Sequence, residues 1–325
     1  MAELTMIEAI NEAMRQEMER DSRIIVLGED VGENGGVFRA TDGLLEQFGD
    51  QRVFDTPLAE SGIIGTSIGL AINGMRPIAE IQFLGFVYQA MDQLAAQAAR
   101  IRFRSAGRFA CPIVVRSPYG GGVRTPELHS DALEALFTHS PGLKVVMPSN
   151  PYDAKGLLIS AIRDEDPVLF LEPMKLYRAF RMEVPEEPYD IPLGQARVVK
   201  EGDDVTILTW GATVPLAAKV AAEMQAKGVD AEVIDLRCLQ PLDIDTIIAS
   251  VEKTGRVMIV HEAVKTGGFG AEVAALISER ALFALSAPIV RIAGYDTPYP
   301  VPSVEDDWLP NAERIAEGIE TLMRY

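Results

Sequence analysis

The stretch Asp55-Thr-Pro-Leu-Ala-Glu60-Ser-Gly62 leads directly into the apolar segment Ile63–Ile72. From Leu58 to Asn73 the single ionisable side chain is Glu60, and small residues recur along the segment. A helix that is apolar all round is buried, and its small residues allow close backbone approach. Because burying an unpaired carboxylate is costly, we expect Glu60 to be hydrogen-bonded or protonated. A carboxylate stabilised only by the helix dipole is the simpler alternative, but such groups usually face water, so the pattern favours a catalytic acid.

Length and composition are those of an ordinary globular protein. The 325 residues are enough for two domains, and 48% are hydrophobic and 24% charged. No apolar run approaches the roughly 20 residues that span a bilayer, and the N-terminus lacks the basic-then-apolar order of a signal peptide. Cys111 and Cys238 lie far apart in apolar segments, which indicates reduced core thiols. These features predict a cytoplasmic protein with no membrane partner.

Net charge narrows the class of partner. The chain carries 30 basic and 48 acidic residues, a net charge of −18, which argues against nucleic acid and suits a basic protein partner. The three histidines, His129, His139 and His261, form no cluster with the cysteines. A zinc site is therefore not expected.

Apolar strand-like runs alternate with helical patterns throughout, which predicts an α/β fold with parallel sheets in two domains. The proline- and acid-rich segment 181–192 predicts an extended linker between domains 1–190 and 191–325. In the first domain we expect strands at 24–27, 77–83, 112–116, 143–148 and 167–172, and helices at 5–20, 60–73, 88–104, 131–139 and 151–163. In the second we expect strands at 205–209, 231–236, 256–260 and 289–293, and helices at 214–227, 243–253, 269–285 and 311–324.

Neither half contains a glycine-rich phosphate loop of the dinucleotide-binding or Walker type. Glycines cluster at Gly120–Gly122 and Gly267–Gly270. The second cluster could open an anion-binding helix N-terminus, but loop flexibility is the favoured interpretation. The chain therefore shows chemistry-bearing residues without an evident place to hold a phosphate.

Polar strings at the ends of several expected strands point to a family. They are Gly28-Glu-Asp-Val-Gly32, Asp55–Glu60, Ala79–Phe86, Arg116–Gly122 and Glu127–Ser130. In open parallel sheets, residues from such strand ends meet in one crevice. Together the strings resemble the β-subunit of the thiamine-diphosphate-dependent decarboxylating component of 2-oxo-acid dehydrogenase complexes, over essentially the whole chain.

The resemblance implies a transketolase-type pyrimidine-binding domain followed by a transketolase C-terminal domain that serves assembly. It implies that a separate α-subunit holds the diphosphate and magnesium, in an α2β2 heterotetramer. Further partners would be the dihydrolipoyl acyltransferase core and its lipoyl domain. For docking to a basic domain of that core we expect Asp296 and Glu305–Asp307, since exposed charges guide association.

Site residues follow from the same resemblance. Glu60 matches the glutamate that hydrogen-bonds the cofactor aminopyrimidine and so activates it. His129 matches an active-site histidine that contacts intermediates or the lipoyl group. Phe86 matches the aromatic residue on the pyrimidine ring, and Glu29, Leu58 and Gln82 match further cofactor-lining positions.

A monovalent-cation site built largely from backbone carbonyls is also implied. The family often has asparagine where this chain has Asp166. The aspartate still offers a carbonyl-type oxygen as a ligand. The matching residues, for potassium, are Ile113, Ala161, Ile162, Asp164 and Asp166.

Two departures bear on the substrate. Branched-chain members usually carry Phe-Ala-Asp-Tyr where this chain has Phe83-Leu-Gly-Phe86, and several adjacent histidines where it has His129 alone. Both differences favour pyruvate; the alternatives within the family are branched-chain 2-oxo acid and acetoin dehydrogenases. A non-catalytic assembly subunit has no need of Glu60, Phe86 and His129 together, and a stand-alone transketolase needs a phosphate-binding domain in the same chain.

Overall fold

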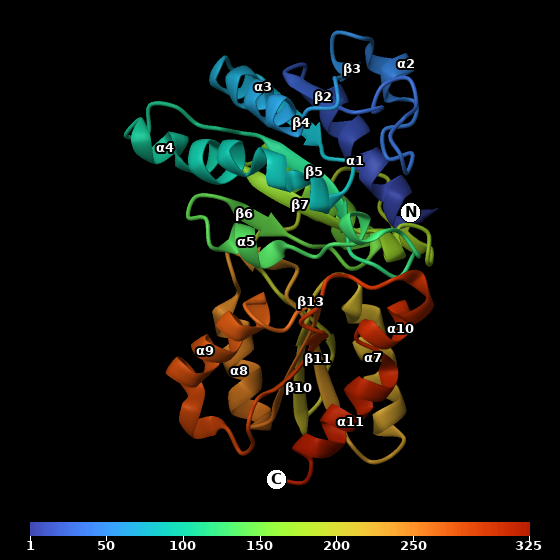
Figure 1. Cartoon of the computed structure of the whole chain (residues 1–325), viewed down its shortest axis with the longest axis vertical. Helices are drawn as coiled ribbons and strands as arrows, with labels where there is room; N and C mark the ends of the chain where they lie inside the picture. The colour runs from blue at the N-terminus through green and yellow to red at the C-terminus, as the bar shows by residue number, and fades with distance from the viewer.

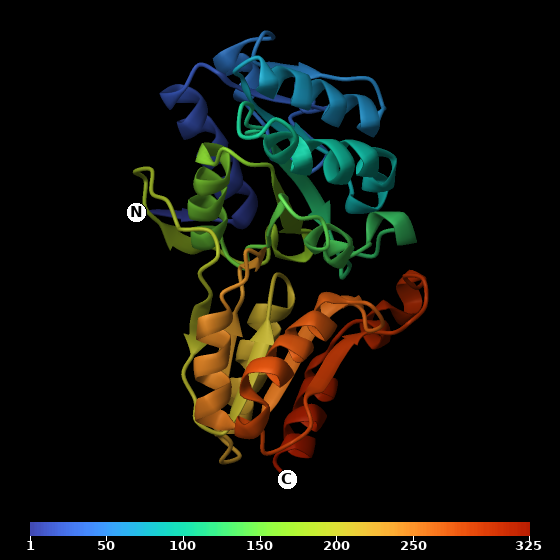
Figure 2. The same ribbon diagram turned by 90° about the vertical axis from the view of Figure 1, so that its left-hand side faces the viewer.

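Two α/β units are stacked along the long axis of the molecule (Figure 1). The computed structural model describes residues 1–325. The first half of the chain forms the upper unit in Figures 1 and 2, and the second half forms the lower unit. No helix combines the length and the apolar character needed to cross a bilayer.

Helix α1 (Met6–Arg20) shows how local signals define an element. Thr5 caps it in a capping box, in which the Glu8 carboxylate accepts a hydrogen bond from the Thr5 N–H at 2.7 Å. Its apolar stripe, including Ile10 and Met14, is fully buried and packs on helix α6 (Pro151–Arg163). The predictions for both helices are confirmed.

A seven-stranded sheet forms the centre of the upper unit, in the order β12-β6-β7-β5-β4-β2-β3. Its inner strands are buried on both faces, as expected for parallel strands covered by helices. The strands are β2 (Ile24–Gly28), β3 (Val53–Asp55), β4 (Arg76–Glu80), β5 (Val114–Tyr119), β6 (Lys144–Val146), β7 (Val168–Pro173) and β12 (Cys238–Gln240). The remaining helices of this half are α2 (Leu44–Phe48), α3 (Glu60–Ile72), α4 (Ile101–Arg104) and α5 (Glu134–Thr138).

The lower unit has a five-stranded sheet in the order β14-β13-β10-β11-β9. Helices α8 and α9 cover one face and α7 and α11 cover the other (Figure 1). The strands are β9 (Arg197–Lys200), β10 (Val205–Thr209), β11 (Ala231–Asp235), β13 (Val257–Val264) and β14 (Val290–Gly294). The helices are α7 (Thr213–Gln225), α8 (Ile244–Thr254), α9 (Phe269–Ala281), α10 (Glu305–Trp308) and α11 (Ala312–Leu322).

Both sheets are mostly parallel, as predicted, and each has one antiparallel strand at an edge. Strand β9 pairs antiparallel with β11, and β12 pairs antiparallel with β6. Because β12 follows residue 191 in the chain yet lies in the first sheet, the two halves share a sheet. The division at 190 stays a prediction.

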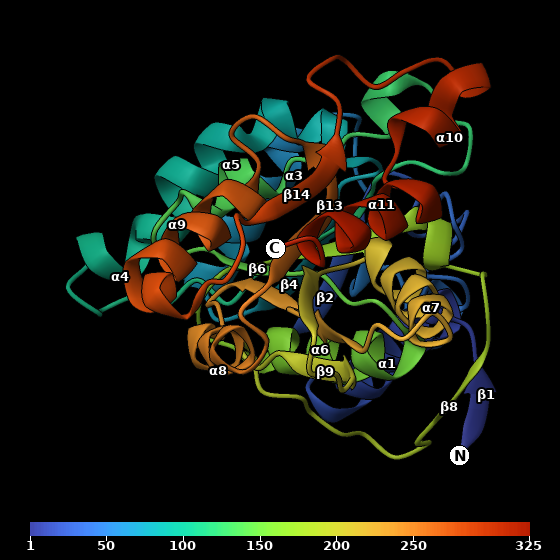
Figure 3. The same cartoon turned by 90° about the horizontal axis from the view of Figure 1, so that it is seen from below.

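The segment 181–192 is not a linker throughout. Its residues Met182–Val184 form β8, which pairs antiparallel with β1 (Ala2–Leu4) at the side of the molecule (Figure 3). Strands of three residues carry no periodic signal of their own, and the pairing joins chain segments about 180 residues apart. Local composition therefore could not predict it.

The single helix expected at 88–104 is also wrong. The segment begins earlier, as a 3-10 helix at Leu84–Ala90 (η1), and continues as a π-helix at Asp92–Gln97 (η2) before a short 3-10 turn and α4. Its side chains that are at most 1% exposed are spaced by three and then by four, which suits first the tighter and then the wider helix. They are Leu84, Val87, Ala90, Leu94 and Ala98.

Helix α3 is not buried on all sides, contrary to expectation. Ile63, Ile64 and Ile68 face the core, whereas the glycine-rich face is exposed. Small side chains cover little area, so this face, which combines glycines with Thr66, is flat and exposed. Its exposed members are Gly62, Gly65, Thr66 and Gly69.

Candidate active site

Two carboxylates lie at the carboxyl edge of the first sheet. Glu29 directly follows β2, and Glu60 opens α3 just beyond β3. Their residues are only 7% and 2% exposed, and neither Oε1 of Glu29 nor Oε2 of Glu60 has a hydrogen-bond partner. The hydroxyl of Thr56, also at this edge, is buried and unpartnered as well. Buried polar atoms are nearly always paired, so this cluster indicates a place for a hydrogen-bonding ligand.

The electrostatics of this edge favour the neutral form of the Glu29 carboxyl or a hydrogen-bond donor beside it. Burial raises the pKa of Glu29 above its ordinary value, and the charges of Glu60 and Asp30 raise it further. Glu60 does not act as the helix cap, since the cap residue is Ala59 and no side chain caps the helix. Glu60 is the first residue of α3, so the helix dipole acts on it, but at 2% exposure it does not face water as the helix-dipole alternative expects.

Of two further predicted site residues, Gln82 is hydrogen-bonded within the chain and Leu58 is exposed. Gln82 follows β4 and its Nε2 donates to Oδ2 of Asp30 at 3.3 Å, which ties the loops after β4 and β2 together. Leu58 is 78% exposed immediately before α3. An exposed leucine beside unpartnered carboxylates is a position that a ligand or a second chain can cover.

His129 ends the short 3-10 turn Glu127–His129 (η4) and contacts two aromatic rings. Its ring centroid is 4.4 Å from that of Phe83 and 5.1 Å from that of Phe86, and its Nδ1 is buried without a partner. The approach depends on Gly85, where a Cβ would lie 2.1 Å from the carbonyl oxygen of Leu128. The structure thus brings His129 and Phe86 together as predicted residues and adds Phe83, which the sequence analysis missed.

A buried ion network supports this edge from below. The Arg116 guanidinium donates to Glu80 at 2.8 Å and to both oxygens of Glu172 at 2.7 and 2.9 Å. The Tyr177 hydroxyl donates to Glu172 at 2.6 Å. Burial raises the pKa of Glu80 although Arg116 opposes the shift. The network links β4, β5 and β7 through Glu80, Arg116 and Glu172. Arg116 is a charged residue inside the apolar run of β5, and this was the sequence signal that could have predicted a buried ion network.

The two halves of the chain match two known domain families. Residues 2–179 match the family described as transketolase, pyrimidine binding domain, and 194–315 match the transketolase C-terminal domain. "Pyruvate dehydrogenase E1 component subunit beta" of Bacillus subtilis is 58% identical over 325 residues, all of both chains. The protein of the same name from Staphylococcus epidermidis is 57% identical, also over 100% of both. This chain belongs to the family of pyruvate dehydrogenase E1 β-subunits.

Solved structures agree on the fold. A split-gene transketolase described as an inactive β4 tetramer superposes with a TM-score of 0.81 at 23% identity, over 99% of both chains. A transketolase from Pichia stipitis gives a TM-score of 0.72 at 14% identity, and there this chain covers 46% of the longer one. The E1 β-subunit fold is thus a transketolase-type pair of domains.

Two backbone carbonyls of the expected potassium site accept hydrogen bonds from an arginine of this chain. The Arg76 guanidinium donates to the carbonyls of Ile162 at 3.0 Å and Asp164 at 2.5 Å. The Asp166 carboxylate pairs with Arg102. No group of histidine, cysteine, aspartate or glutamate side chains could hold a metal ion. Any cation here would depend on the second lone pairs of these carbonyls.

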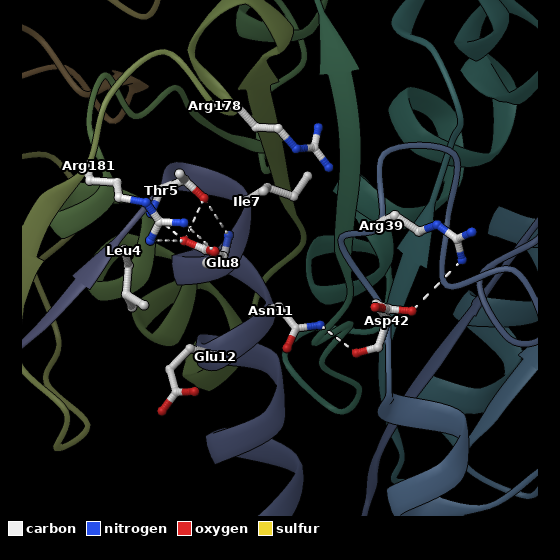
Figure 4. Close-up of a pocket in the computed structure, with 10 residues that line it drawn as sticks. All are labelled: Leu4, Thr5, Ile7, Glu8, Asn11, Glu12, Arg39, Asp42, Arg178 and Arg181. Carbon is white, nitrogen blue, oxygen red and sulfur yellow. Dashed lines mark hydrogen bonds and ion pairs between the residues drawn. The ribbon is translucent and has the colours of Figure 1, made fainter.

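A polar cavity of about 670 Å³ lies apart from the predicted site residues (Figure 4). Three arginines and three acids balance one another in charge along its walls, and none of the predicted residues lines it. Its lining is Leu4, Thr5, Ile7, Glu8, Asn11, Glu12, Arg39, Asp42, Arg178 and Arg181.

Three further expectations have clear outcomes. Glu305 is 1% exposed, so its prediction as a surface docking contact is wrong. Gly268 and Gly270 pack on His261, where added Cβ atoms would lie 2.8 and 2.7 Å from its ring; close packing, not flexibility alone, explains these glycines. Both cysteines are buried free thiols, as predicted.

Proposed function

We propose that this chain is the β-subunit of a pyruvate dehydrogenase E1 component that acts only with an α-subunit. The pair would decarboxylate pyruvate oxidatively on thiamine diphosphate and pass the acetyl group to the lipoyl group of a dihydrolipoyl acyltransferase. The observation that carries the proposal is the buried carboxylate of Glu60, whose Oε2 lacks any partner at the sheet edge. Full-length identity to relatives of that name supports the substrate over the branched-chain and acetoin alternatives.

The unpartnered atoms fit the aminopyrimidine end of the cofactor. Glu60 would hold the proton at the ring nitrogen, Phe86 would pack on the ring, and Glu29 would lie beside it. Bound thiamine diphosphate supplies the carbon nucleophile that adds to the 2-oxo carbon. The diphosphate and magnesium would be held by the α-subunit, because this chain has no phosphate-binding loop. A non-catalytic assembly subunit would have no use for the unpaired carboxylates.

A second chain is also needed to cover exposed apolar surface. The flat glycine face of α3 and the exposed Leu58 lie next to the proposed site. We assign them to contacts within the heterotetramer. Docking of the acyltransferase core would use the surface acids Asp296, Asp306 and Asp307, without Glu305. The two buried thiols suit a cytoplasmic location.

Reconstitution tests this function directly. The isolated chain should bind no thiamine diphosphate at micromolar concentration by calorimetry, because it offers the pyrimidine contacts alone. Co-expressed with the α-subunit, it should catalyse pyruvate-dependent reduction of an artificial electron acceptor. Tight binding by the isolated chain would contradict the division of the site, and faster turnover of a branched-chain 2-oxo acid or of acetoin would contradict pyruvate.

His129→Ala should impair acetyl transfer to the lipoyl domain more than decarboxylation with an artificial acceptor. The loss should be about 10²-fold or more, the scale of a positioned acid–base group. His139→Ala is the matched control, since that histidine is exposed outside the site. Equal losses in both assays, or failure to bind the α-subunit, would make His129 a structural residue.

Potassium at the end of α6 is a separate proposal. The carbonyls of Ile162 and Asp164 keep a second lone pair, and the Glu165 carboxylate, 2.7 Å from Arg76, offsets the charge of that guanidinium. The heterotetramer should then melt at a higher temperature in potassium chloride than in choline chloride of equal ionic strength, because a ligand that binds the native state stabilises it. Identical melting temperatures in the two salts would exclude the site.

A further inference from the structure

The loop that carries His129 is closed at its base. Strand β5 ends at Tyr119, and the N–H of Gly120 donates to the carbonyl of Asp131 at 3.1 Å. Within the loop, the hydroxyls of Thr125 and Ser130 lie 2.6 Å apart. Compact loops of this kind hold their shape when their own side chains and their ends are tied. The closed segment Gly120–Asp131 is called the His129 loop below.

Two carboxylates from the second half of the chain bind the backbone of this loop. Oε1 of Glu305, at the start of α10, accepts from the N–H groups of Gly122 at 3.0 Å and Arg124 at 3.2 Å. Glu262, in β13, accepts from the N–H of Gly121. Figures 1 and 2 show the α10 segment reaching back to the boundary between the two units.

Further contacts reinforce this clamp, by which we mean the hydrogen bonds from the His129 loop to Glu262 and Glu305. The Tyr299 hydroxyl donates to Oε1 of Glu305 at 2.6 Å, and the Arg124 side chain pairs with Glu305 at 3.3 Å. The backbone comes so close that a Cβ on Gly121 would lie 1.7 Å from the Tyr299 hydroxyl oxygen. Gly122 has φ +84°, a conformation that favours glycine. The loop sequence is thus matched to acids that are distant along the chain.

We propose that Glu262 and Glu305 are positioning residues that hold the His129 loop, so that the C-terminal domain contributes to the active site besides assembly. The inference rests on the role of His129 under the proposed function. The carboxyl oxygens of both acids accept these hydrogen bonds away from water, where leaving a backbone N–H without its acceptor is costly. Gly85 and the rings of Phe83 and Phe86 contact the same loop at Leu128 and His129. The two acids bind it nearer its start, so the loop is held at both ends.

A double-mutant cycle in the α2β2 holoenzyme tests the proposal. Glu305→Ala removes the acceptor of the Gly122 and Arg124 N–H groups. It should lower kcat/KM for acetyl transfer to the lipoyl domain about tenfold, a factor that corresponds to the net contribution of about one hydrogen bond. In a His129→Ala background it should cause no further loss, since it acts through that side chain. Glu305→Gln, which keeps an acceptor oxygen, should restore most of the activity. Glu313→Ala, which changes an exposed acid in the first turn of α11, should change nothing.

Hydrogen exchange gives a readout independent of catalysis. Amides at 120–130 should exchange faster in Glu305→Ala, while those of β10 and β11 should not change. Tyr299→Phe, which removes one hydroxyl and keeps the carboxylate, should show the same pattern more weakly and takes the place of Glu305→Ala if that variant does not fold. Additive losses with His129→Ala, or unchanged loop exchange, would overturn the proposal. If His129→Ala itself leaves transfer intact, the role of His129 fails, and hydrogen exchange still decides whether the clamp exists.

Discussion

Glu60→Gln should leave the heterotetramer assembled yet lower its turnover by about 10²–10⁴-fold, the range for loss of a positioned acid–base group. The amide keeps the size of the side chain but cannot hold a proton for the pyrimidine nitrogen. The unpartnered Oε2 of Glu60 makes no hydrogen bond within the chain, so folding should lose little. The measurement is pyruvate-dependent reduction of an artificial acceptor at saturating cofactor, with subunit assembly checked by size-exclusion chromatography.

Glu46→Gln is the matched control for this substitution. Glu46 also lies in the first turn of a helix, α2, but it is exposed. Its replacement should leave activity and assembly unchanged. A loss of no more than about threefold in Glu60→Gln would be far smaller than the loss expected when an acid–base group is removed. That result would make Glu60 a structural residue.

Arg116→Met should destabilise the β-chain by about 3–5 kcal/mol, the cost of removing one partner from a buried ion pair. It would leave the carboxylates of Glu80 and Glu172 buried side by side, with Tyr177 as the remaining donor to Glu172. The affected strand ends carry the proposed site, so activity should fall with stability. Urea unfolding of the assembled enzyme, followed by tryptophan fluorescence, measures the effect.

Two further variants separate buried charge from lost packing. Arg181→Met breaks an ion pair with Glu8 in which the two side chains are 51% and 42% exposed. It should lower the free energy of unfolding by less than about 1 kcal/mol. Adding Glu80→Gln to Arg116→Met should recover part of the lost stability, because it removes one uncompensated charge. Equal destabilisation by Arg116→Met and Arg181→Met would contradict the buried-charge account.

Much of the fold was predictable because its signals are local. The 3.6-residue stripe of α1, the asparagine-capped helix α6 and the apolar inner strands each lie within a short window of the sequence, and each was predicted to within a few residues. The same holds for Glu60, since a lone carboxylate in an apolar helix is visible without any structure. Phe86 and His129 were each predicted as site residues from a family resemblance, not from periodicity, and only the structure shows their rings in contact.

Other features depend on contacts between distant parts of the chain. Strand β12 crosses into the first sheet, the exposed face of α3 is left bare, and the helix expected at 88–104 changes pitch to follow the core. None of these has a local periodicity of its own, because edge pairing and close backbone approach are decided by the partner segment.

By itself, then, the sequence determined the α/β class, most helices and strands, and the isolated acid at the start of α3, since each follows from side-chain patterning along a continuous segment. Only the tertiary structure decided that Glu60 and Glu29 keep unpartnered oxygens at one sheet edge, and that Glu262 and Glu305 bind the His129 loop. Hydrogen bonds between residues more than 140 positions apart depend on how the two units are stacked, and no local pattern encodes that geometry.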